Sequence, residues 1–230
     1  MKKILFLLVN VFAPLTVQAE CNCKSYTDHL VELWSSNGKN GIAVCGVVDP
    51  ENKTPNGSYG LEVTSCMSGE DSLYFSEQVF CTFKKEKDHI LVTEFTRLPF
   101  GKNSSWIDLP CNRFSFRFIK NKLEMKKYFV LIPPNYSESQ IRQIVRKYER
   151  LKSSLNGPDE RDRRWRDENE HPIQDILGQM LACAMMGDKQ AREIMPKMGK
   201  DLKVDGETGE IFSDVTEIYR SYLSSLKNSK

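Results

Sequence analysis

The sequence lacks the short motifs on which most catalytic and cofactor sites are built. It has no glycine-rich phosphate-binding loop and no Cys-x-x-Cys pair, which argues against nucleotide binding and thioredoxin-like redox chemistry. The nearest match to a serine nucleophile elbow, GSYG at 57–60, lacks the required first glycine. Only three histidines are present, His29, His89 and His171, and none stands near a recognisable nucleophile. We therefore predict no catalytic residue, no metal ligand and no cofactor.

The sequence also lacks an excess of either charge. It has 33 basic and 31 acidic residues, and the two lysines of an N-terminal leader account for the difference. A nucleic-acid-binding protein would show an excess of basic residues gathered on one face, so we expect no nucleic-acid partner. Beyond the leader no apolar run is long enough to cross a bilayer, and we expect no integral membrane span.

Residues 1–19, MKKILFLLVNVFAPLTVQA, have the features of an export signal. Lys2 and Lys3 precede a short apolar segment that Pro14 interrupts, and Val17 and Ala19 are the small residues expected before a cleavage site. We therefore expect cleavage of the signal peptide after Ala19 and a periplasmic or secreted mature protein. Export also places the cysteines in an oxidising compartment.

The seven cysteines are distributed unevenly along the chain. Cys183 stands alone far downstream and is a candidate free thiol. Cys21 and Cys23 are too close in sequence to bond each other comfortably, so we expect each to reach a different strand. Six cysteines precede residue 112 and are candidates for up to three disulfide bonds whose pairing the sequence leaves open: Cys21, Cys23, Cys45, Cys66, Cys81 and Cys111.

Residues 41–132 show the pattern of an antiparallel sheet. Apolar or alternating segments at 41–48, 61–67, 73–83 and 89–95 are separated by turn-rich sequence. The clearest alternation is at 113–118, with phenylalanines on one face and Arg113, Ser115 and Arg117 on the other. The chain then reverses near residue 121 into 123–132, which predicts a β-hairpin.

Helices are predicted after the sheet. Ser137 and Gln140 form a capping box before an amphipathic helix that runs to residue 155. The highly charged segment 156–172 is interpreted as a linker. Residues 173–230 show three further apolar-periodic segments, with Ser213 as the expected cap of the last. The predicted fold class is α+β: a disulfide-stapled antiparallel β-sheet region and a long amphipathic helix within 20–155, followed by a small three-helix unit at 173–230.

One turn-rich loop carries the residue types that commonly anchor protein partners, namely Arg97, Phe100 and Trp106. With no catalytic signature in the chain, we expect an exported protein that binds another protein of the envelope. An inhibitor or immunity protein against an envelope-directed toxin or hydrolase is the expected class. One alternative is an envelope hydrolase that combines a histidine with carboxylates dispersed through the strands, of which Glu94 is the strongest candidate. Another is a structural or assembly factor of the envelope.

Overall fold

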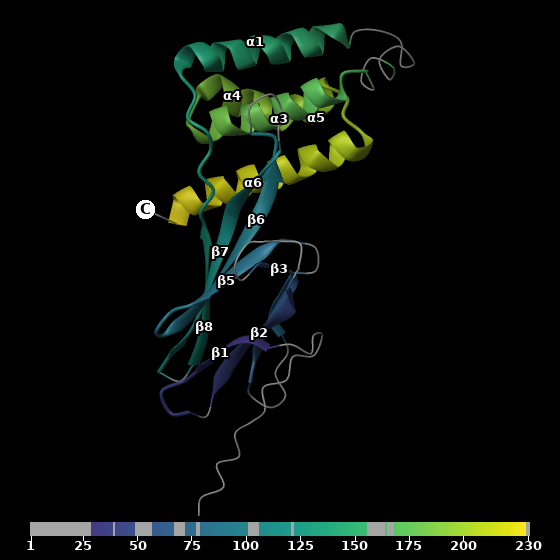
Figure 1. Ribbon diagram of the computed structural model, residues 1–230. Coiled ribbons are helices and arrows are strands. Elements are labelled where there is room, and N and C mark those ends of the chain that lie inside the picture. The colour runs from purple at the N-terminus through teal and green to yellow at the C-terminus, as the bar shows by residue number, and fades with distance from the viewer. Residues whose placement is uncertain are drawn as a thin grey trace, which may run out of the picture.

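The computed structural model describes residues 29–38, 40–48, 57–66, 72–76, 79–100, 106–120, 122–155, 164 and 168–228. The predicted leader, Cys21 and Cys23 lie outside these residues, and so does most of the predicted linker at 156–172. In the described part, an antiparallel β-sheet is followed by a group of helices that lies at one end of the strands (Figure 1). The prediction of an α+β fold is therefore confirmed.

Among the described residues, eight strands form a single sheet in the order β1-β2-β3-β5-β6-β7-β8, with β4 paired to β3. Every pairing is antiparallel. The segment predicted as one strand at 73–83 forms two. The strands are β1 (His29–Trp34), β2 (Gly41–Val48), β3 (Gly57–Ser65), β4 (Ser72–Ser76), β5 (Cys81–Lys85), β6 (His89–Leu98), β7 (Ile107–Ile119) and β8 (Lys122–Phe129).

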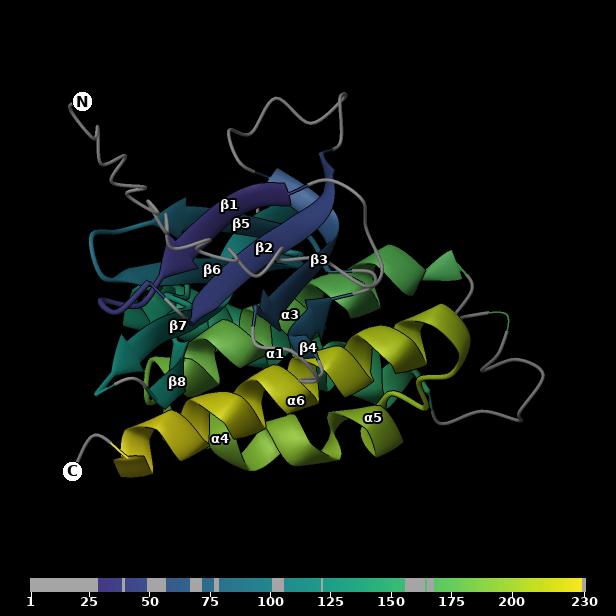
Figure 2. The ribbon, with the colours of Figure 1, turned by 90° about the horizontal axis from the view of Figure 1, so that it is seen from below.

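The sheet folds back on itself, so that β1 and β2 lie over β5, β6 and β7 (Figure 2). The side chains between these layers form one apolar core, which includes Ile42 and Val44 of β2 and Phe116 of β7. A second apolar core lies between the helices and the ends of β6 and β7. The two halves of β6 serve different cores, because Val92 belongs to the first and Leu98 to the second.

The predicted hairpin and the predicted capping box are both confirmed. β7 and β8 pair along the length of β8, and Phe114 and Phe116 are buried on one face. Helix α1 (Glu138–Ser154) begins where the Ser137 hydroxyl accepts a hydrogen bond from the backbone N–H of Gln140, whose side chain accepts one from the backbone N–H of Ser137. Both patterns depend only on residues near each other in the sequence, which is why they are predictable.

The remaining helices share the second core with α1. They are α3 (Glu170–Met185), α4 (Lys189–Ile194), α5 (Met198–Asp201) and α6 (Gly206–Asn228), with a 3-10 turn at Met195–Lys197. The prediction of Ser213 as the cap of the last helix is wrong, because that helix already begins at Gly206. The backbone N–H of Gly209 donates to the carbonyl of Asp205 and closes a helical turn over loop-like sequence. None of the described helices is both long and apolar enough to cross a membrane.

Two of the six predicted disulfide cysteines, Cys81 and Cys111, are buried free thiols, which corrects the prediction for both. They lie in different cores, Cys81 inside the folded sheet and Cys111 beneath the helices, and so they do not bond to each other. Cys45 and Cys66 are disulfide-bonded. Cys183 is a buried free thiol, as its isolation in the sequence predicts.

Candidate functional site

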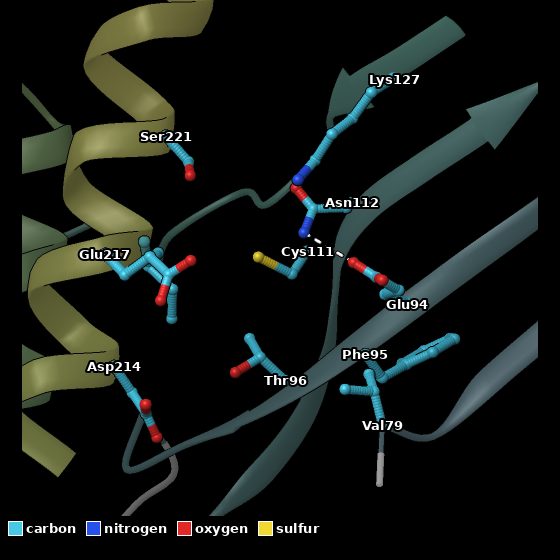
Figure 3. Close-up of a pocket in the computed structure, with 11 residues that line it drawn as sticks. Val79, Glu94, Phe95, Thr96, Cys111, Asn112, Lys127, Asp214, Glu217 and Ser221 are labelled. Carbon is cyan, nitrogen blue, oxygen red and sulfur yellow. Dashed lines mark hydrogen bonds between the residues drawn. The ribbon is translucent and has the colours of Figure 1, made fainter. Parts of the chain in front are cut away.

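A polar groove separates helix α6 from the strands beneath it. Its first cavity, of about 270 Å³, lies between α6 and the strands β6 to β8 (Figure 3). A second cavity of about 360 Å³ continues along α6 and shares four lining residues with the first. We call the two cavities together the α6 groove. Its shared lining residues are Asn112, Lys127, Glu217 and Ser221.

A β-bulge brings the strand residues into this groove. Glu94 of β6 pairs with Asn112 of β7, but the next residue, Phe95, pairs with Pro110, so Cys111 is an extra residue in β7. A regular strand would point successive side chains to opposite faces of the sheet. The bulge relaxes that alternation, and successive residues of both strands line the same cavity.

Helix α6 supplies the opposite wall of the groove. Asp214, Glu217 and Ser221 are spaced by three and four residues, which places them on one face of the helix. The neighbouring residues Val215 and Ile218 are buried against the other helices and fix the rotation of α6 about its axis. The acidic face is therefore held toward the sheet by the packing of the apolar face.

Glu94 is held at the floor of the groove by two hydrogen bonds from other strands. The hydroxyl of Tyr74, on β4, donates to one carboxylate oxygen over 2.5 Å, and Nδ2 of Asn112 donates to the other over 2.8 Å. The Tyr74 hydroxyl also lies 3.5 Å from the sulfur of Cys81. Burial, the neighbouring thiol and Glu94 raise the pKa of Tyr74, so the phenol stays protonated and serves as a donor. Burial likewise raises the pKa of Cys81.

The groove carries a net negative charge in its first cavity, whereas its second cavity is also lined by Arg220. Three carboxylates line its first cavity, and Lys127 is the single cationic side chain among the described residues that line it. Burial, followed by the charges of Glu217 and Glu210, raises the pKa of Asp214. A carboxylate whose ionisation its neighbours oppose marks a place where a positive charge would be stabilised.

Two further groups in the groove support that conclusion. Burial raises the pKa of the Cys111 thiol to about 11, and both Glu94 and Glu217 add to the rise while Lys127 opposes it. The Oδ1 atom of Asn112 is buried and has no hydrogen-bond partner among the described residues. A buried acceptor without a donor costs stability unless a ligand or water satisfies it. The site therefore favours a ligand that brings a positive charge and hydrogen-bond donors.

Exposed apolar side chains lie at both ends of the groove. At one end Phe95 and Val79 line the first cavity, and Phe95 begins a row of aromatic rings that continues through Phe80 to Tyr59. The ring centres in this row are 5.6 and 5.2 Å apart, and Tyr59 is 48% exposed. Near the other end, the last turns of α6 expose Leu223 and Leu226. Exposed apolar patches of this kind are typical of surfaces that bind a partner.

Of the three residues that the sequence suggested as a partner-binding surface, Phe100 is not exposed to a partner. Phe100 is only 8% exposed and belongs to the core beneath the helices. Pro99 packs against Gly178 of α3, and Trp106 is half-buried. Arg97 alone is exposed. The prediction is wrong for Phe100, because the apolar run at 98–100 docks on α3, which removes its aromatic side chain from the surface.

Neither His89 nor His171 lines the groove. His89 is the first residue of β6, where its Nδ1 is 2.7 Å from the carboxylate of its neighbour Asp88. His171 is exposed in the first turn of α3. Glu94, the strongest of the strand carboxylates considered as catalytic candidates, lies in the site, whereas Glu217 was not predicted. Its signal was the polar spacing of 214, 217 and 221 beside an apolar helical stripe.

Comparison with known proteins identifies no relative of this chain. No family model, curated protein or solved structure matches the chain. Within the described residues, no group of three or more histidine, cysteine or acidic side chains is arranged to hold a metal ion. The assignment of a function rests on the geometry and charge of the α6 groove.

Proposed function

We propose that this chain is an exported protein that binds another protein of the cell envelope, and that a basic segment of the partner lies in the α6 groove. One observation carries the proposal: the groove combines three carboxylates, an amide oxygen without a partner among the described residues, and exposed apolar side chains at its ends. Such a mixture suits a polypeptide, whose lysine or arginine side chains supply charge and whose apolar side chains cover the rims. Inhibition or neutralisation of an envelope-directed toxin or hydrolase is the proposed role.

The mode of binding follows from the two chemical features of the groove. A lysine or arginine of the partner enters the first cavity between Glu94 and Glu217 and donates a hydrogen bond to the Asn112 amide oxygen. Neighbouring apolar residues of the partner contact the aromatic row on one side and Leu223 on the other. Electrostatic complementarity of this kind sets specificity and the rate of association more than it sets affinity.

The test uses the partner recovered by affinity capture from periplasmic extract and then purified. Its affinity is measured by titration calorimetry with the wild-type protein and with the double variant Asp214→Asn/Glu217→Gln. We expect the double variant to lose affinity by about tenfold to a hundredfold, since each of these two exposed carboxylates contributes about 1 kcal/mol through its charged contact with the partner. Glu193→Gln, an exposed carboxylate on α4, is the matched control and leaves affinity unchanged. Unchanged affinity in the double variant would reject the groove as the binding site.

A second function is favoured by one specific observation. Glu94 and Glu217 come from opposite walls of the groove and lie on either side of the Cys111 thiol in Figure 3. Two carboxylates facing each other across a cleft are the arrangement that glycoside hydrolases use. The corresponding proposal is an envelope glycan hydrolase without a histidine. Release of reducing ends from peptidoglycan, abolished in both Glu94→Gln and Glu217→Gln, would establish it in place of partner binding.

The disulfide staple is the remaining part of the proposal. The backbone N–H of Cys66 donates to the carbonyl of Gly41, which stands four residues from Cys45 along β2. That offset is about 13 Å, whereas the two Cα atoms of a disulfide are at most about 7 Å apart. Cys45 and Cys66 therefore have separate partners, and we propose Cys21 and Cys23. Mass spectrometry of peptides from the non-reduced mature protein tests the two links.

A further inference from the structure

We propose that two copies of this chain associate through their β8 strands, which pair antiparallel across a two-fold axis at Met125 and join the two sheets. This inference goes beyond the proposed function and does not depend on it. It rests on the exposed edge of β8, on the faces to which its side chains point, and on the order of charges along it.

Among the described strands, none covers the outer edge of β8. β8 is the terminal strand of the sheet, and no described strand pairs with its far side. Met125 is 52% exposed and Tyr128 is 48% exposed, and the two lysines between them are exposed as well. A strand edge presents a row of backbone N–H and C=O groups that a further strand can pair with. A methionine and a tyrosine beside such a row add apolar area for a partner to cover.

The pairing with β7 fixes which side chains of β8 share a face. Met125 lies opposite the buried Phe116, and Lys127 opposite the buried Phe114. These two residues, with Leu123, therefore point toward the sheet's apolar face, whereas Glu124 and the other even-numbered residues point away. In an antiparallel pair, residues directly opposite each other point to the same face. A two-fold axis normal to the joined sheet must then set one residue of β8 directly opposite the same residue of the other copy. We call this an axis at that residue.

The charges select Met125 as that residue. An axis at Glu124 would set this glutamate against its own copy, and an axis at Lys126 or Lys127 would set a lysine against its own copy. An axis at Leu123 would leave only the first three residues of β8 paired. An axis at Met125 sets Glu124 opposite Lys126, twice by symmetry, and brings the two methionines together. Among the registers that pair most of the strand, this is the one that sets opposite charges against each other.

Glu124 lies opposite Arg117 of β7 but is not within ion-pair distance of it, so both charged residues are available for such pairing. Within the described part of the chain, neither Glu124 nor Lys126 forms an ion pair of its own. The same register sets Lys122 opposite the ring of Tyr128, where a cation–π contact adds to the interaction. Lysines on a strand edge ordinarily discourage association, because most registers bring them together. On β8 the lysines exclude all the registers that pair most of the strand, except the register with its axis at Met125.

Cross-linking of engineered cysteines tests the register directly. At the two-fold axis, the Cβ atoms of residue 125 in the two copies lie about 5 Å apart, which is within reach of a disulfide. Residue 128 lies opposite residue 122 and is about 20 Å from its own copy. We therefore expect full-length mature Met125→Cys to form an intermolecular disulfide under mild oxidation, and Tyr128→Cys, almost equally exposed, to remain uncross-linked. Equal cross-linking of both variants, or of neither, would overturn the proposal.

A charge exchange provides the independent measurement. Sedimentation equilibrium of the wild-type protein should give a monomer–dimer equilibrium. Glu124→Lys and Lys126→Glu, taken singly, should each weaken the dimer about tenfold or more, because two attractive pairs become repulsive ones. The double variant Glu124→Lys/Lys126→Glu should restore the wild-type dissociation constant. A protein that is monomeric at every attainable concentration, or a double variant no tighter than the single ones, would refute the β8 interface. Circular dichroism confirms that each variant is folded.

Discussion

The hydroxyl of Tyr74 donates a hydrogen bond to the carboxylate of Glu94 over 2.5 Å, and thereby ties the short strand β4 to the floor of the α6 groove. The bond connects two parts of the folded sheet that share no backbone pairing. Without this donor, Asn112 would be the remaining donor to the carboxylate among the hydrogen bonds from described side chains. The position of Glu94 in the groove therefore depends on a residue that does not line it.

Tyr74→Phe should lower the free energy of unfolding by about 1–3 kcal/mol, because it leaves a partly buried carboxylate with one donor fewer. The ring of Tyr74 packs on Phe114 at 4.8 Å between centres, and phenylalanine preserves that contact. Urea unfolding at pH 7 measures the change. Tyr59→Phe, which removes an exposed hydroxyl, is the control and should stay within about 0.5 kcal/mol of wild type. Equal effects of the two substitutions would show that the hydroxyl of Tyr74 contributes nothing.

The Cys111 thiol makes stability fall at alkaline pH. Its pKa rises from 9.0 to about 11 in the folded protein, so folding favours the protonated thiol. The contribution is therefore complete below pH 9 and is lost as the pH rises toward 11, at a limiting slope of about 1.4 kcal/mol per pH unit. Cys111→Ala should have a lower stability at pH 8 but a flatter decline between pH 9 and 11. Ser221→Ala, in the same groove, should keep the wild-type slope, and a Cys111→Ala slope equal to it would contradict the prediction.

The elements that the sequence predicts correctly are those whose signals are local. The alternation at 113–118 identifies a strand because successive side chains point to opposite faces, and the pair Ser137 and Gln140 identifies a helix start because the two residues satisfy each other's backbone. The turn-rich segment after Asp205 misleads for the same reason. Its glycines are typical of a loop, but the packing of α6 against the other helices extends the helix back to Gly206.

The candidate site was not predictable because it is assembled by tertiary contacts. Glu94 and Glu217 are far apart in the sequence and meet only where α6 crosses the strands. The bulge at Cys111 follows Pro110, and a proline in a strand marks either a bulge or an edge, so the sequence alone does not choose between them. Phe100 was misjudged because its polar neighbours suggested an exposed loop, whereas its surroundings depend on a glycine of α3. Periodicity describes which side of an element is apolar, but not which element covers it.

Asp201 connects α1 to α5 and should make stability sensitive to acid. Its carboxylate accepts hydrogen bonds from the Tyr148 hydroxyl and, over 3.0 Å, from the Lys152 ammonium. The Tyr148 hydrogen bond, and then Lys152, hold the pKa of this carboxyl below its usual 3.8. The stabilisation is therefore present above pH 3.8 and is lost as the pH falls through the lowered pKa.

Asp201→Asn should cost about 1 kcal/mol at pH 7, a value reduced by the partial exposure of the ion pair. The difference between wild type and variant should shrink as the pH falls below 3.8. Chemical unfolding at a series of pH values measures it. Asp108→Asn, an exposed carboxylate on β7, serves as control. A difference that stays constant with pH would mean that the charge of Asp201 is not what stabilises the contact.

The docking of the 98–100 segment on α3 can be tested with a pair of glycines in helices. Replacing a helical glycine with alanine ordinarily stabilises a protein by about 0.5–1 kcal/mol, because alanine has the higher helix propensity. At Gly178 the added methyl group would lie 2.7 Å from Cγ of Pro99 and 3.2 Å from its carbonyl oxygen. At Gly209 the nearest atom would be 3.7 Å away, which is an ordinary contact.

Gly178→Ala should therefore destabilise the protein, by about 1–3 kcal/mol, because the overpacking exceeds the gain in helix propensity. Gly209→Ala should stabilise it by about 0.5–1 kcal/mol. Urea unfolding of the two variants gives the two signs in one experiment. Because Pro99 leads directly into the buried Phe100, the clash would push this segment away from α3, the helix that places it in the second core. A stabilising Gly178→Ala would mean that the segment does not pack on α3, and the burial of Phe100 would then lose its explanation.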